Sequence, residues 1–405
     1  MHRLSKLILL TMVIVLSGCG TAGKVRQLLQ EGTLSKNEYR VTLNFEERNG
    51  LLIVPVTIGG KVRHFLLDTG APNLITSALA SELGMQAGLT YKVGDAHGRA
   101  QPLSFVRVDS LRISDLTFYG TGAIVSDFSA SPELECVGVE GIIGANLLAK
   151  TFLQIDYPNS KIVLASHLDS LQIDTAALRW TFTSSAQRTP QVVLRANGVP
   201  LGPLTVDTGA TGWMAAPKSA FARVRDNGPL QVRRTYGSAS IGLYGDARKD
   251  TLFRTWVTDL TMPDSTALLP AAIDFSAAST GQIGNAYLRQ FVLSFDWRTN
   301  QLYLSPSGVS NEKDLVTFGF NPLFRNDQLL VSLVWQDSQA DREGIRPGDR
   351  VLFMNGMDCI NFDKKAYCRF LIDQQMGKNW EELDLLIEQG GTTRRIKLKK
   401  EPYFH

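Results

Sequence analysis

The stretch that decides the fold is Asp68-Thr69-Gly70-Ala71, because the same four residue types return at Asp207-Thr208-Gly209-Ala210. Each copy follows an apolar run, a turn containing glycine and a second apolar run, which is the pattern of a β-hairpin. The match continues along the chain: Ile142-Ile143-Gly144 ends 76 positions after the first aspartate, and Gln282-Ile283-Gly284 ends 77 positions after the second. The repeat predicts two homologous units that are mostly β.

Composition limits the class of protein to which the chain can belong. It has 405 residues, of which 44% are hydrophobic and 20% charged, values typical of globular proteins. At about 150 residues per domain, this length predicts two or three compact units. The 42 Lys and Arg against 39 Asp and Glu give a net charge of +3, so no charge excess indicates a nucleic-acid or other polyanionic partner.

Two aspartates at equivalent places suit the hydrolysis of a peptide bond. One group must take a proton from water while another gives a proton to the carbonyl oxygen. If Asp68 and Asp207 are held a few ångströms apart, they cannot both ionise, so that an acid and a base coexist. The hydroxyls of Thr69 and Thr208 can hydrogen-bond across the interface between the units. Glycines at the third position allow a tight turn whose N–H groups face the carboxylates.

At these motifs the chain resembles the retropepsin-like and pepsin-like aspartic proteases. The resemblance implies a mainly β fold with two retropepsin-like acid-protease barrels, over residues 45–166 and 180–306. It implies an endopeptidase that acts on polypeptides, with Asp68 and Asp207 as the catalytic pair. The supporting residues that it implies are Thr69, Gly70, Gly144, Thr208, Gly209 and Gly284. No cofactor is expected, and no metal centre, because CxxC, HExxH and EF-hand patterns are absent.

In that family a β-hairpin flap closes over the substrate, and two glycine-bearing stretches are candidates here. The first spans residues 91–98 and contains Tyr91 and Gly94. The second spans residues 235–240 and contains Tyr236 and Gly237. The second is similar to a pepsin flap but falls in the second unit, whereas the first lacks a Tyr-Gly pair. The alternative is that these residues are ordinary loop packing.

A third unit, residues 313–402, resembles a bacterial PDZ domain with an α+β fold. The resemblance rests on the run Gly344-Ile345-Arg346-Pro347-Gly348-Asp349 and the later turn Asn355-Gly356. It implies that Phe318, Gly319 and Phe320 form a loop that captures the C-terminus of a peptide ligand. We expect this unit to influence which proteins are cut rather than whether a bond can be cut. The alternative is a PDZ fold that only packs on the protease and binds nothing.

The amino terminus has the layout of a secretory signal, with two positive charges before a short apolar run. Leu16-Ser17-Gly18-Cys19 resembles a lipobox, which implies cleavage after residue 18, lipidation of Cys19 and an anchor and linker over residues 19–44. An ordinary signal with a chance cysteine is the alternative. No aspartate follows Cys19, so the resemblance implies a bacterial cell-envelope protein, lipid-anchored in the outer membrane and facing the periplasm or the surface.

Three cysteines then remain, which in an oxidising compartment permits at most one internal pair. Cys359 and Cys368 lie close in sequence and could form a disulfide. Three buried thiols that behave as small hydrophobic residues, Cys136 among them, are the alternative.

Two further functions compete with proteolysis of other proteins. One is a catalytically idle peptide-binding lipoprotein that keeps the protease and PDZ folds as a scaffold. The usual mark of such a protein is a lost aspartate, whereas this chain has both. The other is an enzyme that processes only itself.

Overall fold

The protein is described from a computed structural model, and from residue 20 onward the description omits only residues 239, 247–248, 278–280, 310–314, 374–379 and 405. Before residue 20 it describes only the short strands β1 (Leu7–Ile8) and β2 (Met12–Val13). Cys19, the expected lipidation site, therefore lies outside the described residues. The chain is mainly β, as the sequence predicts.

The first unit is built on a hairpin whose second strand ends at Asp68. A strand containing Gly144 runs parallel to it and places this glycine opposite the aspartate. The elements are β6 (Leu51–Ile58), β7 (Lys61–Asp68), β8 (Leu74–Ile75), α2 (Ser77–Glu82), β9 (Leu89–Asp95), β10 (Ala100–Ile113), β11 (Leu116–Val125), α3 (Pro132–Val137), β12 (Gly141–Gly144) and α4 (Ala145–Leu148).

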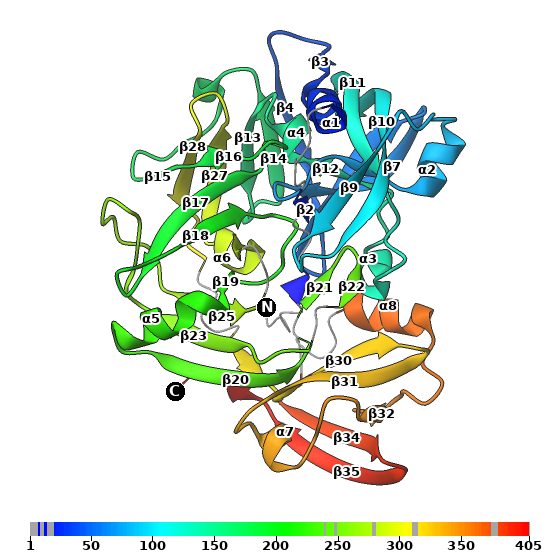
Figure 1. Ribbon diagram of the computed structural model, residues 1–405, viewed down its shortest axis with the longest axis vertical. Coiled ribbons are helices and arrows are strands. Elements are labelled where there is room, and N and C mark those ends of the chain that lie inside the picture. Colours follow the sequence, from blue (N-terminus) through cyan, green and yellow to red (C-terminus); the bar gives the residue numbers. More distant parts are fainter. Residues whose placement is uncertain are drawn as a thin grey trace.

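The second unit repeats this order and ends its own hairpin just before Asp207 (Figure 1). Its elements are β17 (Pro190–Ala196), β18 (Val199–Val206), β19 (Met214–Pro217), α5 (Phe221–Asp226), β20 (Gln231–Gly237), β23 (Phe253–Val257), β25 (Ala271–Ser276), β26 (Gly281–Ile283) and α6 (Asn285–Leu288). In the sequence between β20 and β23 lies a small extra hairpin, formed by β21 (Ser240–Gly242) and β22 (Gly245–Asp246).

A six-stranded sheet joins the two units. In spatial order its strands are β15 (Leu178–Thr181), β28 (Gln301–Pro306), β27 (Phe291–Asp296), β13 (Phe152–Asp156), β14 (Lys161–Ala165) and β4 (Arg40–Asn44). The central pair, β13 and β27, brings one strand from each half of the repeat together. Gln154 Nε2 donates to Ser294 Oγ across this pair at 2.9 Å. The same main-chain ladder thus fixes both aspartate-bearing units relative to each other.

The segment expected to be an anchor and linker is largely folded. Helix α1 (Thr21–Gln30) buries Val25 and Leu29 against the first unit, and β4 extends the six-stranded sheet. Apolar residues at positions 25 and 29 lie on the same face of the helix, which explains this packing. Short flanking elements are β3 (Thr33–Leu34), β5 (Glu46–Arg48), η1 (Leu168–Ser170), β16 (Thr183–Ser184), η2 (Lys218–Ala220) and β24 (Leu260–Thr261).

Residues 315–404 form a C-terminal module with its own hydrophobic core. Its elements are β29 (Val316–Thr317), β30 (Phe320–Arg325), β31 (Gln328–Trp335), α7 (Gln339–Arg342), β32 (Arg350–Met354), β33 (Met357–Asp358), α8 (Lys364–Ile372), β34 (Glu382–Gln389), β35 (Thr392–Lys399) and β36 (Glu401–Pro402). Strand β31 pairs with β20, so the sheet of the second unit continues into the module (Figure 1).

One disulfide links the module to the first unit, and it is not the pair considered from the sequence. Cys368 on α8 bonds to Cys136 on α3, while Cys359 is a buried free thiol. Neither alternative left open by the sequence, a Cys359–Cys368 bridge or three free thiols, is the one found. Nearness in sequence does not indicate the true pair, because α3 packs against α8 and Cys136 lies in the core cluster of the module.

Candidate active site

The two Asp-Thr-Gly loops cross each other in the interior. Asp68 and Asp207 are both fully buried, at 0% exposure. A Cβ atom placed on Gly70 would lie 2.5 Å from Cγ of Asp207, and one on Gly209 would lie 2.4 Å from Cγ of Asp68. Each loop thus leaves room for the carboxyl group of the other only because its third residue is glycine. The structure brings the two predicted aspartates together at one place.

The two threonines hold these loops together by four reciprocal hydrogen bonds. Thr69 Oγ1 donates to Val206 O at 2.6 Å and accepts from the N–H of Thr208 at 3.1 Å. Thr208 Oγ1 donates to Leu67 O at 3.0 Å and accepts from the N–H of Thr69 at 3.0 Å. Both side chains are buried at 0% exposure, so each hydroxyl satisfies backbone groups that water does not reach.

Backbone N–H groups orient the two carboxyl groups in the same way. The N–H of Gly70 donates to Oδ1 of Asp68 at 2.7 Å, and the N–H of Gly209 donates to Oδ1 of Asp207 at 2.8 Å. Oδ2 of Asp68 is also buried, and no N–H group of the described residues donates to it. One oxygen of Asp68 is therefore fixed by its own loop, and the other is left for the neighbouring carboxyl group or a reactant.

Burial raises the pKa of Asp68 well above its usual range, and the negative charge of Asp207 raises it further. The N–H donors of Gly70 and Ala71 act in the opposite direction but are weaker. A carboxyl group in this position keeps its proton at pH values where an exposed aspartate would have lost it. The site can therefore hold a proton donor and a carboxylate at the same time.

Gly144 and Gly284 stand directly behind the two loops. A Cβ atom on Gly144 would lie 2.2 Å from the carbonyl carbon of Pro72, and one on Gly284 would lie 2.5 Å from Gly212 O. Neither position has room for a side chain. Both glycines therefore let the strand pack against the backbone that follows the aspartate.

Three asparagines support the loops, and the sequence analysis did not select them. The side-chain oxygen of Asn73 accepts from the N–H of Gly144 at 2.8 Å, and that of Asn146 accepts from the N–H of Asn73 at 2.7 Å. Asn285 donates to Thr208 O at 2.7 Å and accepts from the Tyr157 hydroxyl at 2.8 Å. Asn146 and Asn285 follow the repeat glycines at different offsets, and that recurrence of one residue type was the available signal.

The flap candidates lie on strands at equivalent places in the two units. Tyr91 and Gly94 are in β9, which forms a hairpin with β10. Tyr236 and Gly237 are in β20, whose end pairs with β31 of the module instead of standing free. The hairpin formed by β21 and β22, which the sequence analysis did not single out, contacts the β9–β10 hairpin: the Tyr244 hydroxyl donates to Val93 O at 2.8 Å.

The residues Phe318, Gly319 and Phe320 lie far from the aspartates in sequence and within the module. The two phenylalanines are buried in its core, at 1% and 0% exposure. Gly319 has a φ of +87°, and a Cβ atom there would lie 2.5 Å from Ser338 Oγ. The structure does not bring these three residues to the aspartate loops.

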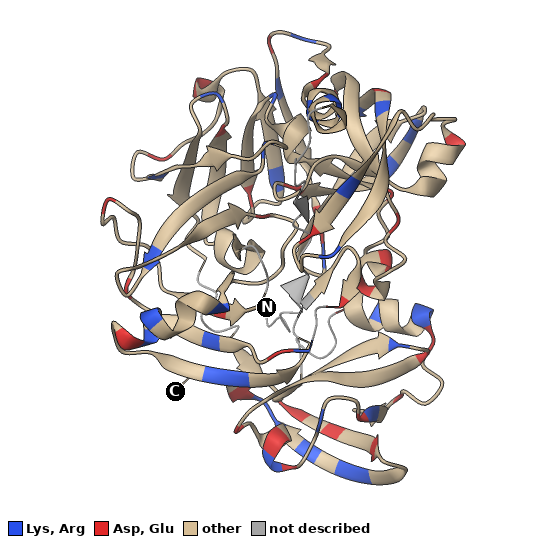
Figure 2. Cartoon of the chain, in the orientation of Figure 1, with Lys and Arg blue, Asp and Glu red and all other residues tan. Residues whose placement is uncertain are grey.

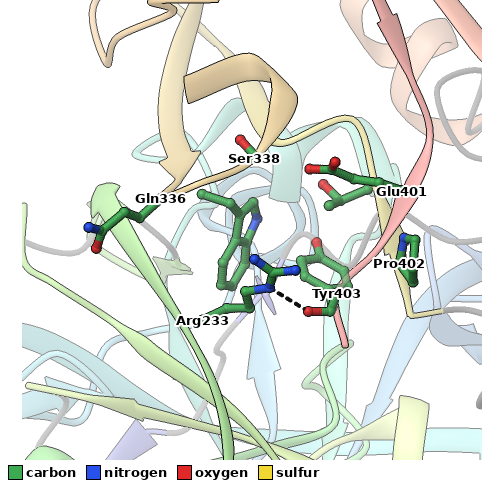
Figure 3. A pocket seen from close by; sticks show the side chains of 8 residues that line it. Arg233, Gln336, Ser338, Glu401, Pro402 and Tyr403 are labelled. Atoms are coloured by element: carbon green, nitrogen blue, oxygen red, sulfur yellow. Dashed lines mark hydrogen bonds between the residues drawn. The ribbon is translucent and has the colours of Figure 1, made fainter. Parts of the chain in front are cut away.

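A small pocket lies where the module meets the second unit (Figure 3). Arg233 Nε donates to Tyr403 O at 2.7 Å beside it. Its lining is Arg233, Thr317, Trp335, Gln336, Ser338, Glu401, Pro402 and Tyr403. Since this lining includes neither aspartate, we treat the pocket as part of the packing between the module and the second unit.

Charges and membrane features add little to the site. Figure 2 shows Lys and Arg interspersed with Asp and Glu over the described part of the chain. Among the described residues, no group of three or more His, Cys, Asp or Glu side chains could hold a metal ion. In the same part of the chain, no helix is both long and apolar enough to cross a membrane.

Several known proteins are similar to parts of this chain. It is 33% identical over 94 residues to proteins of Staphylococcus aureus strains COL and N315, each named "Probable CtpA-like serine protease". That match covers 23% of this chain and 18% of each relative, so it spans less than a fifth of their length.

Among solved structures, Basic 7S globulin from soybean matches with a TM-score of 0.42 and 12% identity, over 68% of this chain and 96% of that one. A retropepsin-like aspartic protease from Rickettsia conorii matches with a TM-score of 0.22 and 16% identity, over 33% of this chain and 92% of that one. The family model described as "Aspartyl protease" matches residues 54–147, so it covers the first Asp-Thr-Gly loop together with Gly144.

Proposed function

We propose that the protein is an aspartic endopeptidase in which Asp68 and Asp207 act as one catalytic unit. The observation that carries this proposal is the crossing of two Asp-Thr-Gly loops, which buries both carboxyl groups side by side. The family match to aspartyl proteases over residues 54–147 supports the same class of enzyme. A single buried aspartate would not support it, because the reaction needs an acid and a base together.

The chemistry follows from one proton shared by the pair. The ionised carboxylate takes a proton from water, whose oxygen attacks the carbonyl carbon of the substrate. The protonated carboxyl group gives its proton to the carbonyl oxygen, which forms a tetrahedral diol. In the second step a carboxyl group protonates the amide nitrogen, the other carboxylate takes a proton from a hydroxyl of the diol, and the C–N bond breaks. The pair then again holds one proton.

The hairpin of β9 and β10 and the hairpin of β21 and β22 are proposed to cover an extended peptide during this reaction. They meet through the Tyr244 hydroxyl, which donates to Val93 O, and through Arg99, whose Nη2 donates to Gly245 O at 2.7 Å. Such closure would exclude bulk water from around the reacting bond and retain the attacking water, which strengthens the electrostatic effect of the aspartates.

The module is proposed to have a PDZ-like fold that mainly packs on the protease units. In a PDZ domain a peptide ligand adds to a strand beside a helix, which here would be β30 and α8. Helix α3 of the first unit contacts both: Glu133 pairs with Arg325 on β30, and Cys136 is bonded to Cys368 on α8. These contacts favour a packing role over capture of a C-terminal peptide at Phe318, Gly319 and Phe320.

The cellular place of the protein is proposed from its amino terminus. Lipidation of Cys19 would attach it to a membrane of the bacterial envelope, with the outer membrane favoured because no aspartate follows the cysteine. Replacing Cys19 by serine should abolish labelling with a radioactive fatty acid. Labelling that persists in this variant would contradict the proposal.

The decisive experiment is digestion of a peptide library by the soluble chain, residues 20–405, from acid to neutral pH. Asp68→Asn and Asp207→Asn should each reduce cleavage to background, as fully as the double variant, because the two groups act as a unit. Asp169→Asn, at an exposed position outside both hairpins, is the matched control and should cleave normally. Peptide binding without any cleavage by the parent would favour the idle peptide-binding scaffold instead.

A further inference from the structure

Arg325 of the module forms ion pairs with two different parts of the protease. Its Nη1 and Nη2 donate to Oε1 and Oε2 of Glu133 on α3, at 2.9 and 3.1 Å. Its Nε donates to Oδ2 of Asp246, at the end of β22, at 2.7 Å, and Nη2 also contacts Oδ1 of that carboxylate. One guanidinium group therefore joins the module, the first unit and the extra hairpin of the second unit.

Glu133 is the fixed side of this arrangement. Its side chain is fully buried at 0% exposure, and it also accepts from the Tyr367 hydroxyl at 2.5 Å and from Ser131 Oγ at 3.1 Å. A buried carboxylate is tolerated only when it is paired and hydrogen-bonded. Glu133 lies on α3 and Tyr367 on α8, and the Cys136–Cys368 disulfide joins the same two helices one turn further along α3. Arg325 is thus held in place by the buried partner.

Asp246 is the more exposed partner, at 32% exposure, and it ends a short hairpin. Two hydrogen bonds join that hairpin to the β9–β10 hairpin, from Arg99 to Gly245 O and from Tyr244 to Val93 O. Gly242 also packs closely on the β9–β10 hairpin, since a Cβ atom there would lie 2.8 Å from Cδ2 of His97. Asp246 therefore connects Arg325 to the hairpin that meets the β9–β10 hairpin.

We propose that Arg325 is a positioning residue of the protease, which is held on Glu133 and pins Asp246 so that the two hairpins stay closed on each other. This inference rests on the proposed function, in which the hairpins cover the substrate. It assigns to the module a direct part in holding the two hairpins over a substrate. A peptide then binds tightly only while the contact between Arg325 and Asp246 is intact, whatever the sequence of the peptide.

The test uses Asp246→Asn in the soluble chain, because this change leaves the buried Glu133 paired with Arg325. Hydrogen exchange over residues 93–99 and 240–246 should become about tenfold faster, since a charge-assisted pair that holds the hairpins is lost. For a cleavable peptide, KM should rise about tenfold while kcat and its pH profile stay unchanged, because the aspartate pair is not touched. Asp115→Asn, which breaks an exposed ion pair with Lys36, is the control and should change neither quantity.

A second variant, Arg325→Lys, tests the coupling. Lysine keeps a positive charge beside Glu133 but cannot fork between two carboxylates. It should reproduce the effect of Asp246→Asn, and the double variant should be no worse than either single variant. Unchanged exchange in Asp246→Asn would overturn the inference, as would faster exchange throughout the module. Faster exchange in the hairpins of a chain that cleaves no peptide would support the clamp and reject the protease.

Discussion

At the scale of single residues, Asp68 is a carboxyl group whose surroundings oppose its ionisation. Burial and the charge of Asp207 raise its pKa above the usual 3.8. The unfolded chain therefore loses this proton at a lower pH than the folded chain does. Stability from this group is present below about pH 3.8 and is lost as the pH rises through the folded pKa.

We expect Asp68→Asn to prevent the loss of stability at higher pH, because an amide has nearly the same shape as the carboxyl group and does not ionise. At neutral pH the variant should unfold about 2 °C or more above the parent, and the difference should vanish toward pH 4. Differential scanning calorimetry from pH 4 to 8 measures it. A difference of equal size at both ends of this range would show that the raised pKa is not its source.

The threonine pair gives a second prediction at this scale. Thr69→Val keeps the shape of the side chain but leaves Val206 O and the N–H of Thr208 without their partner. Each buried group left unsatisfied costs about 1–3 kcal/mol of unfolding free energy. Urea denaturation should show this loss in Thr69→Val and a much smaller one in Thr69→Ser, which retains the hydroxyl. Equal midpoints for the two variants would contradict the role of the hydrogen bonds.

The sequence predicted the aspartates, threonines and glycines of the loops because their spacing recurs. The structure places all of them at the crossing of the loops or directly behind it. Asn73 was not predicted, since an asparagine in a turn is common and the second unit has no asparagine at the matching place. Its role depends on the N–H of Gly144, which only the folded chain brings near.

At the scale of elements, the end of β20 is shared between the second unit and the module. Gly237 has a φ of +111°, and a Cβ atom there would lie 2.0 Å from Ser332 O. The sequence offers the stretch around this glycine as a candidate flap. It cannot show which strand occupies the outer edge, because that depends on how the module docks.

Gly237→Ala should therefore separate β20 from β31. Hydrogen exchange of the Ser238 N–H, which donates to Ser332 O at 2.9 Å, should increase at least tenfold. Gly198→Ala is the matched control, because Gly198 also has a positive φ but nothing lies within 4 Å of its Cβ position. If the control loosens β20 equally, backbone strain and not the close contact is responsible.

At the scale of the whole molecule, the module is tied to both units. It shares a sheet with the second unit and a disulfide with the first. Removal of residues 310–405 should therefore impair even the cleavage of short peptides, in contrast to the expectation from sequence that it would spare them. That expectation treated the module as an appendage, since nothing in the repeat indicates what packs on α3.

The disulfide should contribute substantially to stability, because it joins positions 232 residues apart. The double variant Cys136→Ser/Cys368→Ser should lose about 2–5 kcal/mol of unfolding free energy. Denaturant titration with and without dithiothreitol measures this loss. The reductant should lower the stability of the parent to that of the double variant and leave the double variant unchanged. If the disulfide of the parent is reduced and its stability does not change, the prediction is contradicted.

The link between α3 and α8 also determines how late in synthesis the contacts between the module and the first unit can form. A ribosome makes Cys136, Glu133 and both hairpins long before it makes Arg325 and Cys368. Until that late segment arrives, a nascent chain has no clamp for its hairpins and only an unpaired thiol on α3. We expect a chain that stops before residue 325 to carry a free thiol at Cys136 and two hairpins without their clamp, so that under the proposed function it binds a peptide weakly.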